Sequence, residues 1–404
     1  MKTVGRILVA YLLLTLLFTG AMVGVFCIPS SLIEDNVRQS VAQVTHDGKM
    51  FTAKVGEIEP LKIGTFSDCL ILGIAYCGDS NQPLQSAMND IFMMQDGSPV
   101  TGAQQMFDRT QDKELQPVVY SRYWHGNQTI IRPLLCVTTV HGIRVINMLL
   151  LAVLLIALLA ALWVRVGRGE ALTITACLLA VMVPSVPLCL NYVPTFYLAL
   201  VFSLLILLWK PATSHQGNPL ILFFVIGALT TFFDLLTTPM VAMAVPLVVY
   251  MLYRKPEQTW RTVITLSLAW LLGYASLWAT KWLLAAMITG HAAFSDAMGA
   301  VTQRTVGHNE QDYMLWCLKW TAASFIAIAA FTALVVALFG KSRQMLRHNS
   351  WMLLVAMSSY VWAFVLLEHT WHHLHFTWRT FVVLLIGMAL FFRYSLTLTK
   401  PKRS

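Results

Sequence analysis

The sequence predicts an all-α protein that crosses a membrane several times. Of its 404 residues, 57% are hydrophobic and only 12% are charged, whereas soluble globular domains carry about 25% charged residues. The mean hydropathy is +0.66. Its apolar residues gather in runs of roughly 17 to 25, the length that crosses a bilayer as a helix. The expected fold class is therefore an all-α polytopic membrane protein with about ten transmembrane helices.

The apolar runs divide the chain into three membrane regions. The first is 1–27, with its apolar part near 7–27. The second is 143–281, with helices 2–7 expected near 145–164, 171–190, 194–209, 219–235, 239–253 and 260–281. The third is 315–393, with helices 8–10 expected near 315–339, 351–368 and 378–393. A cleaved signal peptide is the alternative for the first run, although its apolar part is long for one.

The basic residues predict the orientation of the chain. They cluster in alternate short connections, such as 254–261, and in the basic tail 394–404. The positive-inside rule then places both termini in the cytoplasm of a multi-pass cell-membrane protein. Because the net charge of +9 comes from these clusters rather than from a soluble surface, it argues against a nucleic-acid partner.

Residues 28–142 form a long segment between the first two spans, expected on the outer side. This segment holds twelve of the nineteen acidic residues and is too long and too patterned for a linker. Short amphipathic helices are expected at 67–76 and 83–94, with turns at 78–83 and 95–102. We therefore predict a small helical domain that lies on the membrane.

The rest of the outer side adds a second loop and three cysteines. Residues 282–314 begin amphipathic and end polar, which predicts a segment lying along the membrane surface. Cys69, Cys77 and Cys136 fall on the oxidising side, which permits one disulfide, and they lack the C-x-x-C spacing of zinc or redox sites.

Two ionisable residues stand at expected membrane depth, where each costs about 2.5–3.5 kcal/mol on insertion scales and needs a reason. Asp234, in FFDLLTTP, either caps the turn before Pro239 or faces an outward cavity. Lys281, in GYASLWATKW, is either a snorkelling interfacial lysine among tryptophans or a cation for a lipid-linked phosphate.

Two further clusters lie where the chain meets the membrane. In YSRYWHG (120–126), Arg122 and His125 stand among aromatic residues, which anchor an interface or form a site, since arginine binds phosphate and aromatic faces stack on sugars. In EHTWHHLHFTWR (368–379), His369 and His373 are one helical turn apart and Arg379 follows. Zinc binding and a structural interface are alternatives here, but no H-E-x-x-H pattern is present, and we favour an anion or substrate site with no metal.

The order of these segments resembles the GT-C class of membrane glycosyltransferases, with one amino-terminal span, a large first outer loop and many later spans. In that class a carboxylate soon after the first span acts as the base, and the donor is a sugar on a polyprenyl phosphate. Glu34 and Asp35 stand about seven residues beyond the first span, in place of the usual tandem Asp-Asp or Asp-Glu. The resemblance therefore implies Asp35 as the base, with Glu34 and then Asp68 as alternatives.

A second resemblance is carried by four local patterns. YxRYWHG, FxDLLTxP, GYxxxWxxKW and HxxxHxxFTxR, found at 120–126, 232–239, 273–282 and 369–379, are similar to those of a group of bacterial multi-pass membrane proteins. Their ionisable residues, together with one in the second outer loop, are the candidate phosphate and sugar contacts: Arg122, His125, Asp234, Lys281, Arg304, His369, His373 and Arg379.

The expected function is transfer of a sugar from an outward-facing polyprenyl-phosphate carrier to a glycan or glycolipid acceptor of the cell envelope. Such a reaction needs a carboxylate to take the acceptor proton and cations to stabilise the departing phosphate. No cofactor is expected, and a divalent metal stays an open alternative that the sequence does not indicate. The rival functions are a transporter or flippase for an amphiphilic substrate and a non-catalytic assembly partner. A cavity lined by both the first loop and the final histidine stretch favours the enzyme, whereas a cleft between similar halves favours transport.

Overall fold

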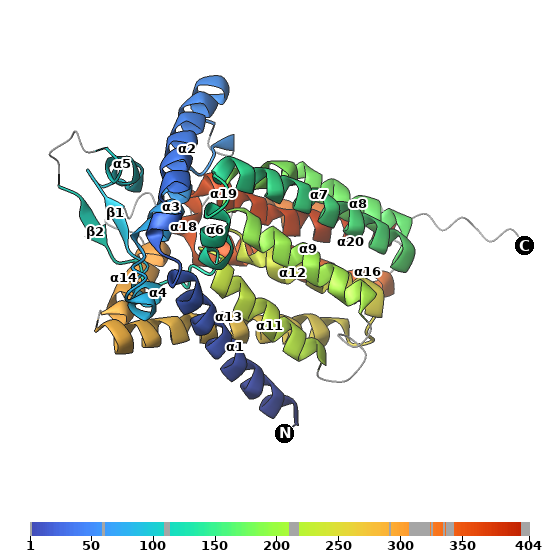
Figure 1. Cartoon of the computed structure of the whole chain (residues 1–404). Helices are drawn as coiled ribbons and strands as arrows, with labels where there is room; N and C mark the ends of the chain where they lie inside the picture. The colour runs from blue at the N-terminus through green and yellow to red at the C-terminus, as the bar shows by residue number, and fades with distance from the viewer. Residues whose placement is uncertain are drawn as a thin grey trace, which may run out of the picture.

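A computed structural model describes residues 2–58, 61–108, 114–209, 218–290, 292–306, 324, 326–333, 336 and 343–396. Within them the regular structure is helical apart from one short two-stranded sheet (Figure 1). The predicted all-α fold is confirmed. Four helices are long and apolar enough to cross a membrane, Thr3–Phe26, Val140–Arg165, Thr259–Thr289 and Leu374–Ser395, as expected for a multi-pass membrane protein.

The segment between the first two long helices (28–139) is here called the loop domain. It follows α1 (Lys2–Phe26), and its buried residues share clusters with α1, α7 (Val140–Arg165), α11 (Asn218–Phe233) and α13 (Thr259–Thr289). Its elements are η1 (Ser30–Leu32), α2 (Glu34–Val55), α3 (Thr65–Cys77), α4 (Pro83–Asn89), β1 (Phe92–Met94), α5 (Pro99–Gln105), β2 (Gln116–Val118) and α6 (Gln128–Leu135). The strands pair antiparallel, with Met93 opposite Pro117. The helix expected at 83–94 is only partly correct, because Asp90 takes a left-handed φ of +48° and ends it before β1.

The remaining described elements form the helical body. They are α7 (Val140–Arg165), α8 (Arg168–Ala180), η3 (Val183–Leu188), α9 (Val193–Leu208), α11 (Asn218–Phe233), α12 (Pro239–Arg254), α13 (Thr259–Thr289), α14 (Ala293–Val306), α16 (Arg343–Asn349), α17 (Trp351–Val365), α18 (Leu367–His372), α19 (Leu374–Thr377), η4 (Trp378–Phe381) and α20 (Val382–Leu396).

Two of the segments expected after residue 142 differ from these elements. The span expected near 171–190 is not one helix, since α8 ends at Ala180 and a 3₁₀ segment containing Pro184 and Pro187 follows; proline lacks the N–H that an α-helix needs. Part of the second outer loop is helical, because α13 continues to Thr289 and α14 follows. Most of the span expected near 315–339 lies outside the described residues.

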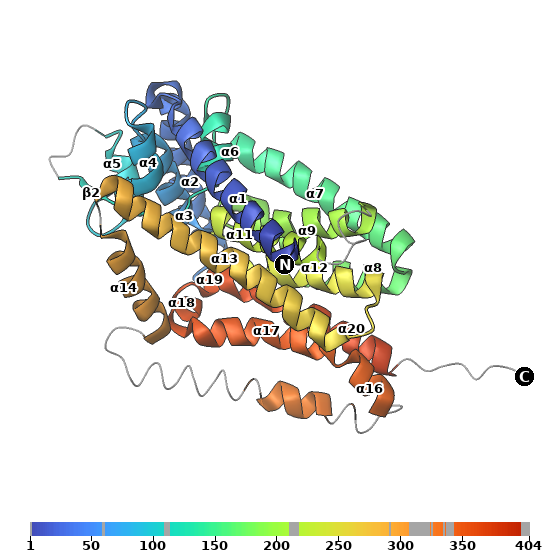
Figure 2. The same cartoon turned by 90° about the horizontal axis from the view of Figure 1, so that it is seen from below.

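The core of the helical body is α12, whose residues are buried from Pro239 through Leu252. It packs against α9, while α17 packs against α20 and α11 against α13. The last contact is close because it is made through glycines. A side-chain carbon on Gly227 would lie 1.9 Å from the Trp270 carbonyl oxygen, and one on Gly273 would lie 2.0 Å from that of Phe224. Figure 2 shows α13 running beside α1 and α17.

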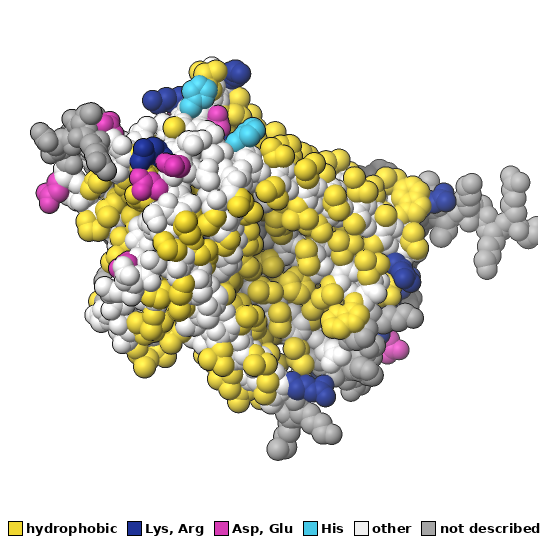
Figure 3. Space-filling model, viewed as in Figure 1, with side chains coloured by type: hydrophobic (Ala, Val, Ile, Leu, Met, Phe, Trp, Pro, Cys, Tyr) yellow, Lys and Arg dark blue, Asp and Glu magenta, His cyan; other side chains and the backbone are white. Residues whose placement is uncertain are grey.

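The surface is divided into a polar and an apolar region. Charged side chains gather over the loop domain and at the far end of the helical body, whereas apolar side chains cover α1, α7, α9 and α11 between them (Figure 3). Exposed apolar residues include Leu13 and Leu16 of α1 and Leu149, Val153 and Ile156 of α7. A contiguous apolar surface of this kind suits contact with lipid.

Candidate functional site

A polar cavity of about 290 Å³ lies where the loop domain meets the helical body. Helix α3 and the 120–126 segment contribute from the loop domain, and α14, which packs on α18, contributes from the other side. Its lining residues are Phe66, Ser67, Leu70, Tyr120, Asn191, Leu235, Arg304, His369, His373, His375 and Phe376. The cavity thus brings together the first loop, the second loop and the histidine stretch, three regions that the sequence singles out.

Arg304 supplies the permanent positive charge of the polar cavity. It is the only arginine or lysine among the lining residues just named, and none of them is a carboxylate. Its guanidinium carbon lies 5.6 Å from the centre of the Tyr123 ring, which holds the side chain by a cation–π contact. A ligand with a negative group, such as a phosphate, would complement this wall.

His369 is fixed in one protonation form by the backbone. Its Nε2 lies 2.8 Å from the Leu236 carbonyl oxygen. Since a carbonyl only accepts, Nε2 carries the hydrogen, and Nδ1 carries a lone pair. Nδ1 is buried and has no hydrogen-bond partner in the described part of the chain. Burial is the main cause that holds the pKa of His369 well below its ordinary value, and the positive charge of Arg304 acts in the same direction, so the ring is a neutral acceptor.

His373 is also a neutral ring. Burial lowers its pKa to about 4, and the neighbouring charges of His375 and Arg304 act in the same direction. The ring stacks on Phe376 at 5.1 Å and lies 4.7 Å from His369. A neutral imidazole binds hydroxyls and takes protons, but it does not supply charge to a phosphate. The cavity therefore pairs one permanent cation with proton-accepting rings.

The YSRYWHG segment acts mainly as a clamp between the loop domain and α13 and α14. The Arg122 guanidinium lies 3.0 Å from Asp296 and 4.3 Å from the Tyr120 ring centre. The Arg122 carbonyl accepts hydrogen bonds from the indoles of Trp278 and Trp282, at 2.5 and 3.0 Å. Arg122 is not among the residues that line the polar cavity, because its side chain is engaged with the protein.

His125 and Lys281 are buried on the α13 side of this clamp. His125 has no exposed surface, and its Nε2 lies 3.3 Å from the Tyr120 carbonyl oxygen. The Lys281 ammonium lies 2.8 Å from Asp90 and donates to the Ala87 carbonyl at 2.7 Å. Lys281 therefore links α13 to α4. It neither reaches toward the membrane interface nor leaves its ammonium free to bind a phosphate.

Asp234 and Arg379 also form hydrogen bonds with nearby groups of the protein. The Asp234 carboxylate accepts from the Thr237 N–H at 3.0 Å and from the Thr237 hydroxyl, so it closes the turn before α12. Arg379 donates to the His375 carbonyl at 2.8 Å and to Ser185 at 3.1 Å. Like Arg122, neither is among the residues lining the polar cavity.

The three carboxylates expected to act as bases lie elsewhere in the loop domain. Asp35 is exposed in the first turn of α2, and Glu34 pairs with Arg38 at 2.6 Å. Asp68 is buried beside Arg144 at 3.3 Å and accepts the Leu190 N–H at 2.9 Å. Burial raises the pKa of Asp68 to about 6 against the lowering effect of Arg144. None of the three lines the polar cavity.

Two buried arginines that local sequence patterns did not single out have structural roles, Arg132 in the loop domain and Arg144 in α7. Arg132 donates to the carbonyls of Ala75 and Ile28 at 2.6 and 2.5 Å, and Arg144 bridges Asp47 and Asp68. Both stand in apolar stretches (QTIIRPLL and GIRVIN), and an arginine that interrupts such a stretch is the signal that could have found them.

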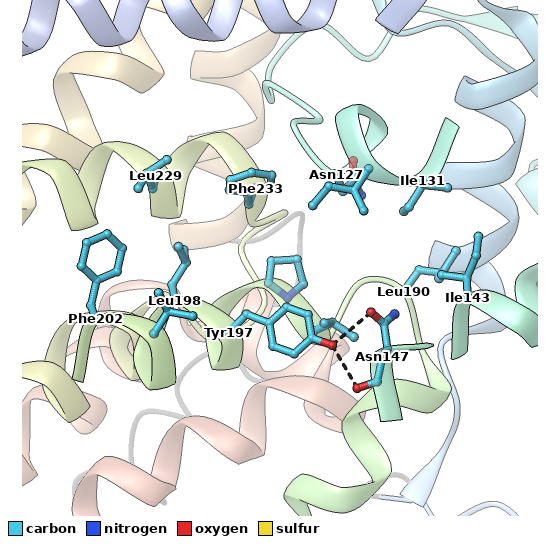
Figure 4. A pocket seen from close by; sticks show the side chains of 14 residues that line it. Asn127, Ile131, Ile143, Asn147, Leu190, Tyr197, Leu198, Phe202, Leu229 and Phe233 are labelled. Carbon is cyan, nitrogen blue, oxygen red and sulfur yellow. Dashed lines mark hydrogen bonds between the residues drawn. The ribbon is translucent and has the colours of Figure 1, made fainter. Parts of the chain in front are cut away.

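A second cavity, the apolar groove, has a volume of about 310 Å³ and lies between α6, α7, α9 and α11 (Figure 4). Its lining residues are Asn127, Ile130, Ile131, Ile143, Asn147, Leu190, Val193, Pro194, Tyr197, Leu198, Val201, Phe202, Leu229 and Phe233. The groove and the polar cavity lie on either side of the same two connections. Leu190 and Phe233 line the groove, whereas their near neighbours Asn191 and Leu235 line the polar cavity.

Metal and disulfide chemistry find no support in the described residues. They contain no group of three or more His, Cys, Asp or Glu side chains arranged to hold a metal. Cys69, Cys77 and Cys136 are free thiols, so the disulfide that the sequence permits is not formed.

Comparisons with known proteins found no match to this chain among family models, curated proteins or solved structures.

Proposed function

We propose that the protein is a membrane glycosyltransferase that moves a sugar from a polyprenyl-phosphate carrier to an acceptor of the cell envelope. The observation that carries this proposal is the polar cavity, which is lined by the loop domain, by Arg304 and by the histidine stretch. A substrate there would contact one cation and several neutral polar groups, as a sugar phosphate requires. Because the loop domain forms one wall, sugar transfer is favoured over transport.

The chemistry assigns different roles to the residues of this cavity. In the transfer, an acceptor hydroxyl oxygen bonds to the anomeric carbon while the bond from that carbon to the phosphate oxygen breaks. Arg304 would stabilise the negative charge of the departing carrier phosphate. His369 or His373 would take the hydroxyl proton, because each is a neutral ring with a nitrogen lone pair. Their lowered pKa makes them weaker bases than an ordinary histidine, so the proton would move only as the acceptor oxygen bonds to the anomeric carbon. This assignment places the base in the cavity rather than at Asp35.

The proposal also fixes the orientation of the chain. The loop domain and the polar cavity would lie on the outer side, where carriers of this class present their sugars, and both termini would lie in the cytoplasm. The clustered lysines and arginines of the short connections support this orientation.

The direct test is binding of a polyprenyl phosphate by the protein in detergent, measured by native mass spectrometry. Arg304→Gln should weaken binding about tenfold or more, because a charge-assisted hydrogen bond to the phosphate is lost. Arg38→Gln is the matched control, since it removes an exposed arginine of the loop domain that pairs with Glu34. Equal affinity of all three proteins would remove the polar cavity from carrier recognition and with it the basis of the proposal.

A further inference from the structure

The apolar groove contains one buried polar side chain without a partner. Asn127 is 4% exposed and lines the groove. Neither its amide nitrogen nor its amide oxygen has a hydrogen-bond partner among the described residues. By contrast, the other polar groups in Figure 4 contact each other, since the Tyr197 hydroxyl donates to Asn147 at 3.0 and 3.1 Å. Asn127 therefore holds an unpaired amide donor and acceptor within the wall of a largely apolar space.

This arrangement selects the chemistry of a ligand. A buried amide without a partner is costly, whereas a bound group that hydrogen-bonds to it removes that cost. A pure hydrocarbon chain, such as the tail of an isoprenoid carrier, would fill the groove and leave Asn127 unpaired. An acyl chain joined through an ester or amide linkage would place a carbonyl, and in an amide also an N–H, beside its apolar part.

The groove has the position that such a lipid requires. Asn127, Ile131 and Leu190 lie at one end of it and Phe202 and Leu229 at the other (Figure 4). The end with Asn127 belongs to the loop domain, where the polar surface begins. Figure 3 shows apolar surface over α7, α9 and α11 around this region, so a membrane lipid would meet the groove from the side. Its linkage would sit at the polar end and its chain along the helices.

We propose that the apolar groove binds the acyl chain of an ester- or amide-linked membrane lipid, with the linkage against Asn127, and that this lipid is the acceptor of the transferred sugar. The head group would then lie close to the connections that the groove shares with the polar cavity, at Leu190–Asn191 and Phe233–Leu235. The role of this lipid as the acceptor rests on the proposed function, whereas its binding in the groove does not.

The test is photo-crosslinking in nanodiscs of phosphatidylcholine and phosphatidylglycerol that contain a trace of diacyl lipid with a diazirine in one chain. Labelled residues are identified by mass spectrometry. The proposal expects label on Leu198 and Leu229 in the wild-type protein. Val201→Trp, at a half-exposed groove position, should reduce this label about tenfold by filling the space. Val153→Trp, the same change at an exposed position of α7 outside the groove, should leave the label unchanged.

Asn127→Leu separates acyl lipids from other occupants. It should reduce labelling by the diacyl lipid several-fold and increase labelling by a diazirine hydrocarbon that has no linkage. Equal reduction by Val201→Trp and Val153→Trp, or no effect of Asn127→Leu, would overturn the inference. So would displacement of the label by a polyprenyl phosphate, which would assign the groove to an isoprenoid tail. Arg304→Gln should not change the label, so that failure of the proposed function would remain distinguishable.

Discussion

The ammonium of Lys281 lies 2.8 Å from the carboxylate of Asp90, and neither side chain has any exposed surface. Replacing Lys281 with Met would leave a buried carboxylate without its cation, which destabilises proteins by about 3–5 kcal/mol. We therefore expect a large fall in the thermal unfolding temperature of the Lys281→Met protein in detergent.

Two variants control this prediction. The double variant Lys281→Met, Asp90→Asn should recover part of the loss, since it removes the uncompensated charge. Arg38→Met breaks the exposed pair with Glu34, for which the expected cost is about 0–1 kcal/mol. If Lys281→Met were no more costly than Arg38→Met, the buried pair would not support the fold.

Asp68 should make the stability of the loop domain depend on pH in an uncommon direction. Its pKa is raised from 3.8 to about 6, chiefly by burial. Between these two values the folded protein binds the proton more tightly than the unfolded chain does, so stability falls as pH rises. The unfolding temperature of wild type minus that of Asp68→Asn should therefore decrease from pH 4 to pH 6. A difference that increases over this range would mean that Arg144 outweighs the burial.

The fixed hydrogen of His369 predicts which substitution separates structure from catalysis. Gln places its amide nitrogen near the position of Nε2, so His369→Gln should keep the hydrogen bond to the Leu236 carbonyl and lose the Nδ1 lone pair. The thermal unfolding temperature should change little, while sugar transfer should slow about 100-fold or more if His369 is the base. His372→Gln, at an exposed histidine that pairs with Glu368, should transfer sugar at the wild-type rate. Normal transfer by His369→Gln would leave His373 as the candidate base.

Replacing Asp35 should have the opposite result to replacing His369, because sugar transfer should hardly change. A GT-C mechanism would make it the base, but its side chain is exposed on α2 and does not line the polar cavity. We expect Asp35→Asn to transfer sugar within about twofold of wild type and to unfold within about 0.5 kcal/mol of it. Loss of transfer in a stably folded Asp35→Asn protein would return the base to the start of α2.

The orientation of the chain can be tested with two exposed lysines. Lys49 lies on α2 of the loop domain, and Lys255 lies between α12 and α13. In a Cys27→Ser background, a membrane-impermeant maleimide added to intact cells should label Lys49→Cys and not Lys255→Cys. Labelling of Lys255→Cys only would show that the loop domain faces the cytoplasm.

The parts of the site that local sequence could predict differ physically from the parts that it could not. His369 and His373 stand out locally, because titratable residues close to apolar runs need a reason. Arg304 is the weakest of the candidates, since an arginine in a polar loop is usually solvated. Asn191 and Asn127 do not stand out, since their positions in the cavity walls depend on packing between helices that are far apart in the sequence. The same limit applies to cations, because nothing near Lys281 reveals that Asp90, 191 residues earlier, neutralises it.

The helix boundaries also divide into those that local sequence predicts and those that it does not. The apolar length of α7 and α13 was sufficient to predict long helices, because each 1.5 Å of rise needs another apolar residue in the bilayer. The break after Ala180 depended on Pro184 and Pro187, which composition alone treats as part of one apolar run. The end of α4 depended on one residue, Asp90, taking a left-handed conformation.

The pairing of Lys281 with Asp90 has a consequence for the order in which the protein is made. A ribosome synthesises Asp90 long before Lys281, because 191 residues separate them. Until α13 has entered the membrane, the nascent loop domain has no Lys281 to neutralise the carboxylate that it must bury. The outer side of the protein should therefore mature late, and release of chains truncated before Lys281 should leave a loop domain that proteases degrade.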